Sequence, residues 1–220
     1  MGRREPYARA VEDTEAPPAT RAERRQLAAA DTRATILAAA RERLLSVGYA
    51  NLSTRTVAEA AEVPLSQIHY HFGSRQQLVL AILEAENARL LERQRGMFGG
   101  PEPLWRQWER ACDYLDEDLE SGYVRVLQEM IAAGWSDRDV AEQVLAMLRS
   151  WLDVLEEVSS EAERRFGPLG PFTASDVATL VGLAFLGGEA VTLLGDEEWA
   201  GRVRTALRRV TDLIRAAEER

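Results

Sequence analysis

The sequence predicts an all-α protein of about nine helices, arranged in two units. Apolar residues recur at helical spacing along most of the chain, and no segment shows the apolar–polar alternation of a half-buried strand. Between two long helical patterns, the stretch from Gly96 to Pro103 holds three Gly and two Pro residues, which marks a boundary. The 220 residues suffice for one large domain or two small ones.

The N-terminal segment, residues 1–26, is expected to be a disordered arm, because Arg, Glu and Pro are frequent there and large apolar side chains are few. The first helix is expected to begin at Asp31, as its N-cap, and to end at Val47, since Gly48 interrupts the apolar periodicity.

Two short helices and a long one complete the N-terminal unit. The first short helix is capped by Ser53 or Thr54 and ends at a tight turn over residues 62–64. The second, LSQIHYHF, spans residues 65–72, and a long helix capped by Ser74 continues to about residue 95. Five further helices, separated by Gly or Pro, are expected at about residues 103–120, 123–134, 137–165, 173–194 and 196–218.

Both histidines of the chain, His69 and His71, lie in the second short helix. Two residues apart, they point about 200° away from each other on a helix, whereas metal-binding pairs stand four residues apart. No nucleophile with an orienting partner is recognisable, and the single Cys112 excludes a multi-cysteine zinc site. We therefore expect no metal, no cofactor and no enzymatic activity.

The two short helices instead fit a helix-turn-helix, whose second helix enters the DNA major groove. Its first turn carries Leu65, Ser66 and Gln67, and a Gln there can bond to adenine through two hydrogen bonds. Beyond that turn, residues 69–71 reach phosphates, although packing remains the alternative for Tyr70 and His71.

Arg75 stands in the first turn of the long helix, where free backbone amides add donors for an anion. The charge distribution agrees with a DNA partner: residues 21–95 carry 11 Arg against 8 acidic residues, whereas residues 96–220 carry 13 against 24. The cluster Arg21, Arg24 and Arg25 either follows DNA phosphates or is a solvated tail.

The stretch VGYANLSTRTVAEAAEVPLSQIHYHFGSRQQL resembles the DNA-binding segment of TetR-family transcriptional regulators, over about residues 31–95. Three residues depart from the family pattern. Glu62 replaces the turn glycine, so the turn must form without a free left-handed position. His69 replaces the usual tyrosine, which keeps a phosphate contact with shorter reach and adds dependence on pH. Arg75 replaces the usual lysine and keeps the charge.

The resemblance implies that Thr54 and Arg55 also face DNA, where Arg55 either bonds to guanine or stays solvated. It further implies that residues 27–95 form a helix-turn-helix DNA-binding domain with its connecting helix, and that residues 96–220 bind a small molecule and dimerise. On this basis we expect a ligand-responsive repressor that a small molecule releases from a palindromic operator. The alternative is a DNA-binding architectural or adaptor protein without an effector.

The stretches 173–194 and 196–218 are the expected homodimer surface. The first is apolar on nearly every face, so a partner subunit must cover what its own chain leaves open; the alternative is a monomer with this helix as its core. The apolar run from Val177 to Gly188 is too short to cross a bilayer. Without a signal peptide as well, the expected location is the cytoplasm, with no membrane partner.

Large side chains within residues 104–151 are numerous enough to line a cavity for a largely apolar effector, although such a set can also be plain core. Two carboxylates in apolar segments, Glu129 and Glu189, need partners if they are buried. An Arg across the dimer interface is preferred for that role over a cationic ligand, with Arg125 and Arg208 as candidates. The candidate lining residues are Trp105, Trp108, Cys112, Leu127, Met130, Trp135 and Trp151.

Overall fold

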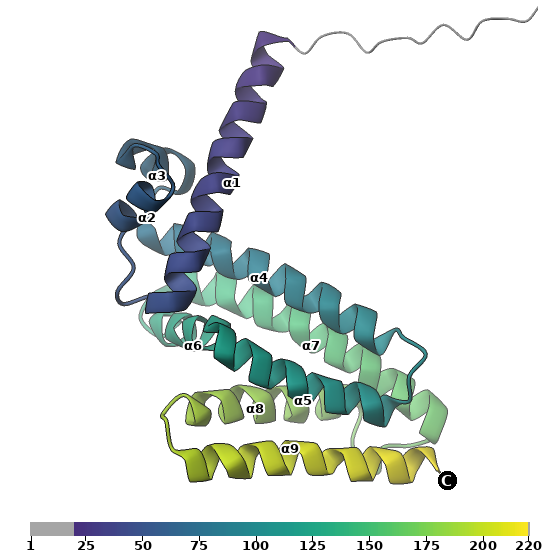
Figure 1. The fold of residues 1–220 in the computed structure, drawn as a ribbon. Coiled ribbons are helices and arrows are strands. Elements are labelled where there is room, and N and C mark those ends of the chain that lie inside the picture. Colours follow the sequence, from purple (N-terminus) through teal and green to yellow (C-terminus); the bar gives the residue numbers. More distant parts are fainter. Residues whose placement is uncertain (1–19, 220) are drawn as a thin grey trace, which may run out of the picture.

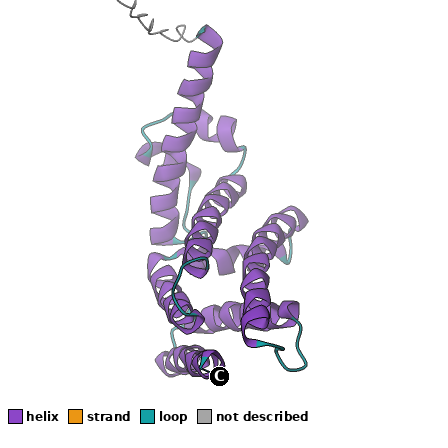
Figure 2. Ribbon diagram, turned by 90° about the vertical axis from the view of Figure 1, so that its right-hand side faces the viewer, coloured by secondary structure: helices purple, strands orange, loops and turns teal. Residues whose placement is uncertain are grey.

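The computed structural model describes residues 20–219, and within that range it consists of nine α-helices and no strand (Figure 2). The all-α prediction is confirmed. Residues 1–19, most of the expected arm 1–26, lie outside the described residues. The helices are α1 (Arg21–Val47), α2 (Thr54–Ala60), α3 (Leu65–Phe72), α4 (Arg75–Phe98), α5 (Leu104–Ser121), α6 (Tyr123–Gly134), α7 (Arg138–Phe166), α8 (Ala174–Thr192) and α9 (Glu197–Glu218).

The helices form a small N-terminal group and a layered body (Figure 1). Helices α1, α2 and α3 stand at one end, and α4 runs from them into the body, where it packs on α7. Helix α6 also packs on α7, while α5 packs on α9. Helix α8 contacts both α7 and α9, so that α8 and α9 form the outermost layer.

Helix α1 begins ten residues earlier than the sequence predicted. It starts at Arg21, so Asp31 is an interior residue and not an N-cap. Arg21, Arg24 and Arg25 accordingly lie exposed on the first turns of a helix and not on a disordered arm. The alanine-rich sequence that follows favours helix even where no neighbour covers it, a tendency that apolar periodicity does not register.

The start sites of α2 and α4 follow from serine caps. The Ser53 hydroxyl accepts the backbone N–H of Thr56 at 3.1 Å, which decides between the two predicted caps of α2. The Ser74 hydroxyl accepts the N–H of Gln77 at 3.1 Å and begins α4, as predicted. Each serine satisfies one of the donors that a helix N-terminus leaves free.

One apolar core joins the N-terminal group to the body. Buried side chains of α1, α3 and α4 pack in one cluster with those of α6 and α7, so no break in packing separates the two units. A second cluster joins α5, α8 and α9 around Trp108, Phe185 and Leu207. Fully buried members of the first cluster include Ile36, Leu44, Ile68, Leu78, Ile82, Val126, Met130 and Val140.

The turn between α2 and α3 differs from the expectation that it would form without a left-handed residue. Glu62 itself adopts that conformation, with φ of +54°, and is the one described non-glycine residue with a positive φ. The Val63 N–H donates to the Ala58 carbonyl at 3.0 Å across the turn. A left-handed conformation costs a residue with a Cβ about 1–2 kcal/mol.

Replacing Glu62 with Gly is therefore expected to raise the free energy of unfolding by about 0.5–1 kcal/mol, after subtracting the greater flexibility of Gly in the unfolded chain. Urea unfolding monitored by circular dichroism measures the change. Glu62→Ala is the matched control, because it removes the carboxylate and keeps the Cβ. An equal gain from Gly and Ala would show that charge, and not backbone strain, sets the stability of this turn.

Candidate nucleic-acid interface and ligand cavities

Helix α3 has one buried face and one exposed face. Ile68 and Phe72 pack into the core and fix the helix on α2 and α4. Tyr70, at 76% exposure, and Leu65 point outward, as do Ser66 and His69, whereas Gln67 and His71 are half-buried. A short helix held rigidly from behind, with polar residues in front, has the form required to enter a DNA groove.

The two histidines have separate local partners. The Gly73 carbonyl can only accept a hydrogen bond, so His69 donates its Nδ1–H to it at 3.1 Å, and Nε2 remains available for another partner. The ring of His71 meets that of Tyr70 edge-on, with centroids 4.9 Å apart. The sequence left open whether Tyr70 and His71 pack or face DNA: Tyr70 is exposed, whereas His71 is half-buried.

Beside α3, the start of α2 offers Thr54 and Arg55. Thr54 is half-buried. Arg55 is exposed, and its Nε lies 3.2 Å from the Glu59 carboxylate. An exposed pair of this kind contributes little to stability, so the guanidinium can exchange it for a DNA contact at small cost.

Arg75 has a structural role that the sequence did not reveal. Its Nη1 donates to the Leu52 carbonyl at 3.1 Å, and its guanidinium lies over the Tyr49 ring, 4.5 Å from the centroid. The residue thereby braces the loop between α1 and α2. Its part in binding a phosphate is limited to the guanidinium donors that this contact leaves free.

The C-terminus of α1 is docked on the start of α6. The Arg125 guanidinium donates to the Leu45 carbonyl at 2.7 Å, and the Glu129 carboxylate accepts the backbone N–H of Tyr49 at 2.7 Å. Within its own chain, Glu129 thus has a backbone amide as its partner. Gly122 permits this approach, because a Cβ there would lie 2.4 Å from the Leu45 carbonyl oxygen.

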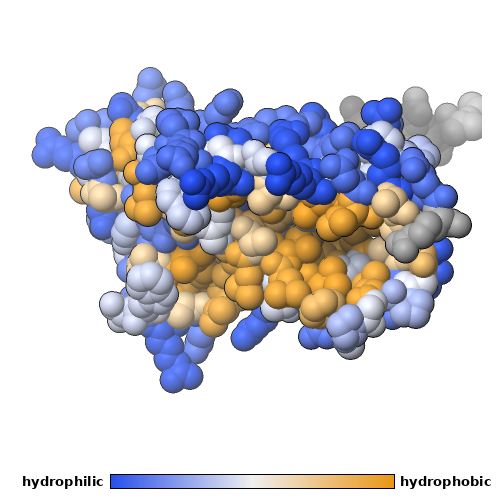
Figure 3. Space-filling model, turned by 90° about the horizontal axis from the view of Figure 1, so that it is seen from below, coloured by the Kyte–Doolittle hydropathy of each residue, from blue (hydrophilic) through white to orange (hydrophobic). Residues whose placement is uncertain are grey.

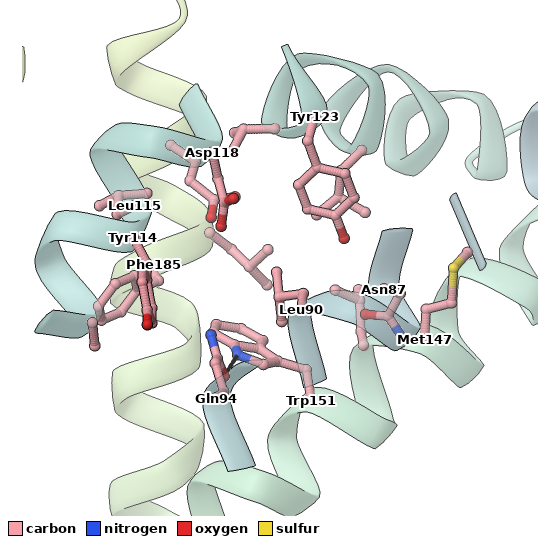
Figure 4. Close-up of a pocket in the computed structure, with 16 residues that line it drawn as sticks. Asn87, Leu90, Gln94, Tyr114, Leu115, Asp118, Tyr123, Met147, Trp151 and Phe185 are labelled. Atoms are coloured by element: carbon pink, nitrogen blue, oxygen red, sulfur yellow. Dashed lines mark hydrogen bonds between the residues drawn. The ribbon is translucent and has the colours of Figure 1, made fainter. Parts of the chain in front are cut away.

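A small cavity of about 50 Å³ lies among α4, α5, α6, α7 and α8 (Figure 4). Of the residues proposed from the sequence, Leu127 and Trp151 line it, and the Trp151 indole N–H donates to the Gln94 side chain at 3.0 Å. The remaining lining residues come from all five helices. They are Asn87, Leu90, Gln94, Ala111, Tyr114, Leu115, Asp118, Tyr123, Val124, Met147, Leu148, Phe185, Leu186 and Glu189.

A larger cavity of about 540 Å³ opens among α5, α7, α8 and α9, beside the loop 167–170. Trp108, also proposed from the sequence, contributes to its wall, and its indole N–H is satisfied by the Leu207 carbonyl at 2.8 Å. The lining is almost wholly apolar. Ser159 is polar, but its hydroxyl donates to the Leu155 carbonyl at 2.8 Å.

The other four residues proposed for the ligand site line neither cavity. Cys112 and Met130 are packed in the two core clusters. The Trp105 ring carries the guanidinium groups of Arg106 and Arg215, with the carbon of the latter 4.1 Å from its centroid. Trp135 is 83% exposed, because it follows the last residue of α6. Spacing on one helix face therefore identified large side chains, but it did not distinguish those packed in the core from those that line a cavity.

Comparison with known proteins agrees with this geometry. Residues 36–82, which span the helix-turn-helix, match the profile of "Bacterial regulatory proteins, tetR family". The chain therefore carries a helix-turn-helix domain of the TetR type of transcriptional regulators. No curated protein matches the sequence.

Several solved structures resemble most of the chain in fold. A TetR-family regulator from Pectobacterium atrosepticum is 22% identical with a TM-score of 0.66, covering 90% of this chain and 97% of its own. NemR of E. coli in its reduced form is 18% identical with a TM-score of 0.65, covering 81% and 96%. FadR of Bacillus subtilis in complex with stearoyl-CoA is 12% identical with a TM-score of 0.66, covering 82% and 96%. These identities show a shared fold.

Glu189 is the buried carboxylate of the smaller cavity. It is 9% exposed, and its Oε2 accepts the Gln128 amide at 3.2 Å. The partner expected from the sequence was an Arg, but the structure provides a neutral amide. Burial raises the pKa of the Glu189 carboxyl to about 7, although the Gln128 hydrogen bond acts in the opposite direction.

Stability should consequently fall as pH rises. The unfolded chain releases the Glu189 proton near the ordinary value of 4.5, whereas the folded chain holds it until about pH 7. The free energy of unfolding is therefore expected to decrease through this window, by about 3 kcal/mol at 1.4 kcal/mol per pKa unit, and then to level off. Glu189→Gln should lack that decrease, as measured by urea unfolding between pH 4.5 and 8.

Glu156→Gln on the exposed face of α7 is the control and should keep the wild-type pH profile. If the Glu189→Gln profile runs parallel to that of the wild type, the carboxylate titrates normally and this account of its burial is wrong.

Proposed function

We propose that the chain is a ligand-responsive repressor that binds a palindromic operator as a homodimer and leaves it when a small molecule binds. Residues 27–95 read the DNA, residues 96–220 hold the effector and the partner subunit, and the protein acts in the cytoplasm without catalysing a reaction. The main observation in support of this proposal is the apolar core that joins α3 to the helices around the smaller cavity. This core leaves the polar face of α3 exposed.

The apolar face of α8 and α9 supports the homodimer. Figure 3 views this layer from below and shows a hydrophobic band flanked by polar residues. On α8, Leu180 and Leu183 are 52% and 62% exposed, and on α9 Trp199 and Leu213 are also exposed. Large apolar patches are uncommon on monomers, and a two-fold axis would pair α8 and α9 with their copies in a four-helix bundle.

Helix α8 is also the one described helix that is long and apolar enough to cross a membrane, judged by length and composition alone. Its 19 residues exceed the apolar run recognised in the sequence. Such a helix is weak support for a membrane span, since core helices of soluble proteins pass the same criterion. A dimer interface accounts for its apolar outer face while Phe185 packs inward against Trp108.

Leu183→Glu is therefore expected to convert the dimer to a monomer at micromolar concentration, because a carboxylate would be buried without a partner in the bundle. Sedimentation velocity measures the mass. Leu145→Glu, on an exposed leucine of α7, is the matched control and should leave the dimer intact. A dimer that survives Leu183→Glu combined with Leu180→Glu would place the interface elsewhere.

Operator recognition is expected to separate base contacts from phosphate contacts. An operator selected from a randomised DNA library should lose about 1–3 kcal/mol of binding per half-site with Gln67→Ala or Arg55→Ala, as for a lost bidentate base contact. Binding to random DNA should hardly change. Fluorescence anisotropy with labelled duplexes measures both affinities.

Tyr70→Phe provides the contrast, since its exposed hydroxyl is placed to meet a phosphate. It should weaken the selected and the random duplex to a similar extent, by about 0.5–1.5 kcal/mol for one hydrogen bond. Equal losses on the two duplexes with Gln67→Ala would remove Gln67 from the base-reading residues.

The junction between α1 and α6 supports the link between effector and operator. Arg125 and Glu129 of α6 hold the backbone of α1 and of the loop after it, so a ligand that displaces α6 displaces the DNA-binding helices. A coupling free energy of about 1–3 kcal/mol between the effector site and the DNA-binding site suffices to weaken operator binding 5–150-fold. Two cavities in the body and the stearoyl-CoA complex of FadR favour this function over an architectural protein without effector.

A further inference from the structure

The smaller cavity holds a buried carboxylate that no cation in its walls neutralises. Its two carboxylates are Asp118 and Glu189. Asp118 is paired with Arg93 of α4, whereas among the described residues no cationic group pairs with Glu189, whose hydrogen bond comes from the Gln128 amide. A buried carboxylate in this position either keeps its proton or takes a cation from outside.

Two more polar groups face the same space. The Tyr123 hydroxyl points into the cavity (Figure 4), and Asn87 lines it from α4. No hydrogen bond joins either side chain to another described residue. Burial, followed by the negative charge of Glu189, raises the pKa of Tyr123. Glu189, Tyr123 and Asn87 together offer three acceptors, and a primary ammonium carries three donors.

Size and lining restrict the rest of the ligand. A volume of about 50 Å³ corresponds to about four water molecules, at 10–15 Å³ each. The remaining wall is apolar and aromatic, with Leu127, Trp151 and Phe185 among its members. Aromatic faces attract cations as well as hydrocarbon. The cavity therefore fits a cation with a short alkyl chain.

We propose that the effector is a compact primary amine, bound in its protonated form with the ammonium group on Glu189, Tyr123 and Asn87. This inference deepens the proposed function, on which it rests, by naming the chemical class of the ligand.

The test compares n-butylammonium with 1-butanol, which has the same number of non-hydrogen atoms and no charge. Isothermal titration of the purified full chain, without DNA, is expected to give at least tenfold tighter binding of the amine. Glu189→Gln should remove this preference and leave 1-butanol binding unchanged. Glu156→Gln, which changes the net charge equally on an exposed surface, should bind the amine like the wild type.

Tyr123→Phe removes one acceptor from a hydroxyl that no described residue holds, so the fold is expected to tolerate it. Amine binding should weaken several-fold, with no effect on 1-butanol. Equal binding of amine and alcohol by the wild type, or an amine preference that survives Glu189→Gln, would overturn the proposal.

The pH dependence gives an independent readout. The groups that face Glu189 are Asp118 of α5, already paired with Arg93, and Tyr123 and Gln128 of α6. Because the amine needs the ionised carboxylate, its affinity should rise several-fold between pH 6 and 8, and the Glu189→Gln variant should show no such rise. A flat wild-type profile would contradict the ion pair.

The assay without DNA separates the two proposals. Loss of the amine preference with operator binding intact overturns only the ligand class. Amine binding that never alters operator affinity leaves the site in place and overturns the regulatory function.

Discussion

The attachment of α1 to α6 is the contact on which the arrangement of the two units depends. The last carbonyls of a helix have no partner within the helix and carry partial negative charge. Arg125 binds one of them at Leu45, and Glu129 takes the Tyr49 amide just beyond the helix. Charge-assisted bonds of this kind are directional, so they set the angle of α1 as well as its position.

The rest of the N-terminal unit is built outward from that contact. Tyr49 carries the Arg75 guanidinium on its ring, and Arg75 in turn holds the Leu52 carbonyl just before α2. A second attachment lies on α4, where Glu86 forms a bidentate ion pair with Arg41 of α1. Polar contacts that begin at α6 thus position the segments on either side of α3, while Ile68 and Phe72 give α3 itself its apolar support.

Local chemistry explains how much could be predicted from the sequence. Helix order and most boundaries follow from caps and glycine stops, as at Ser74 and Gly73, since these act within one turn of the chain. The early start of α1 and the left-handed Glu62 were missed. At the start of α1, helix propensity acts without an apolar pattern. At Glu62, the surrounding fold imposes a conformation that the residue disfavours.

The cavities were harder to predict, because each is assembled from several helices. Leu127, Trp108 and Trp151 were found by size, but Trp135 shares that property and lies on the surface. Asn87 and Tyr123 were missed, since a polar residue on a helix usually faces solvent. The Gln128 amide was not foreseen as a partner of Glu189, because it lies two helices earlier in the chain, on α6, and such a contact has no signature in sequence.

Gly122 has a consequence for how motion passes through the molecule. A hydrogen atom is all that separates its backbone from the Leu45 carbonyl, and its φ of +84° is one that other residues rarely adopt. The two backbones are therefore in direct contact, with no flexible side chain between them to absorb a shift. A displacement at the start of α6 is therefore transmitted directly to the end of α1, even when it is smaller than the width of a methyl group.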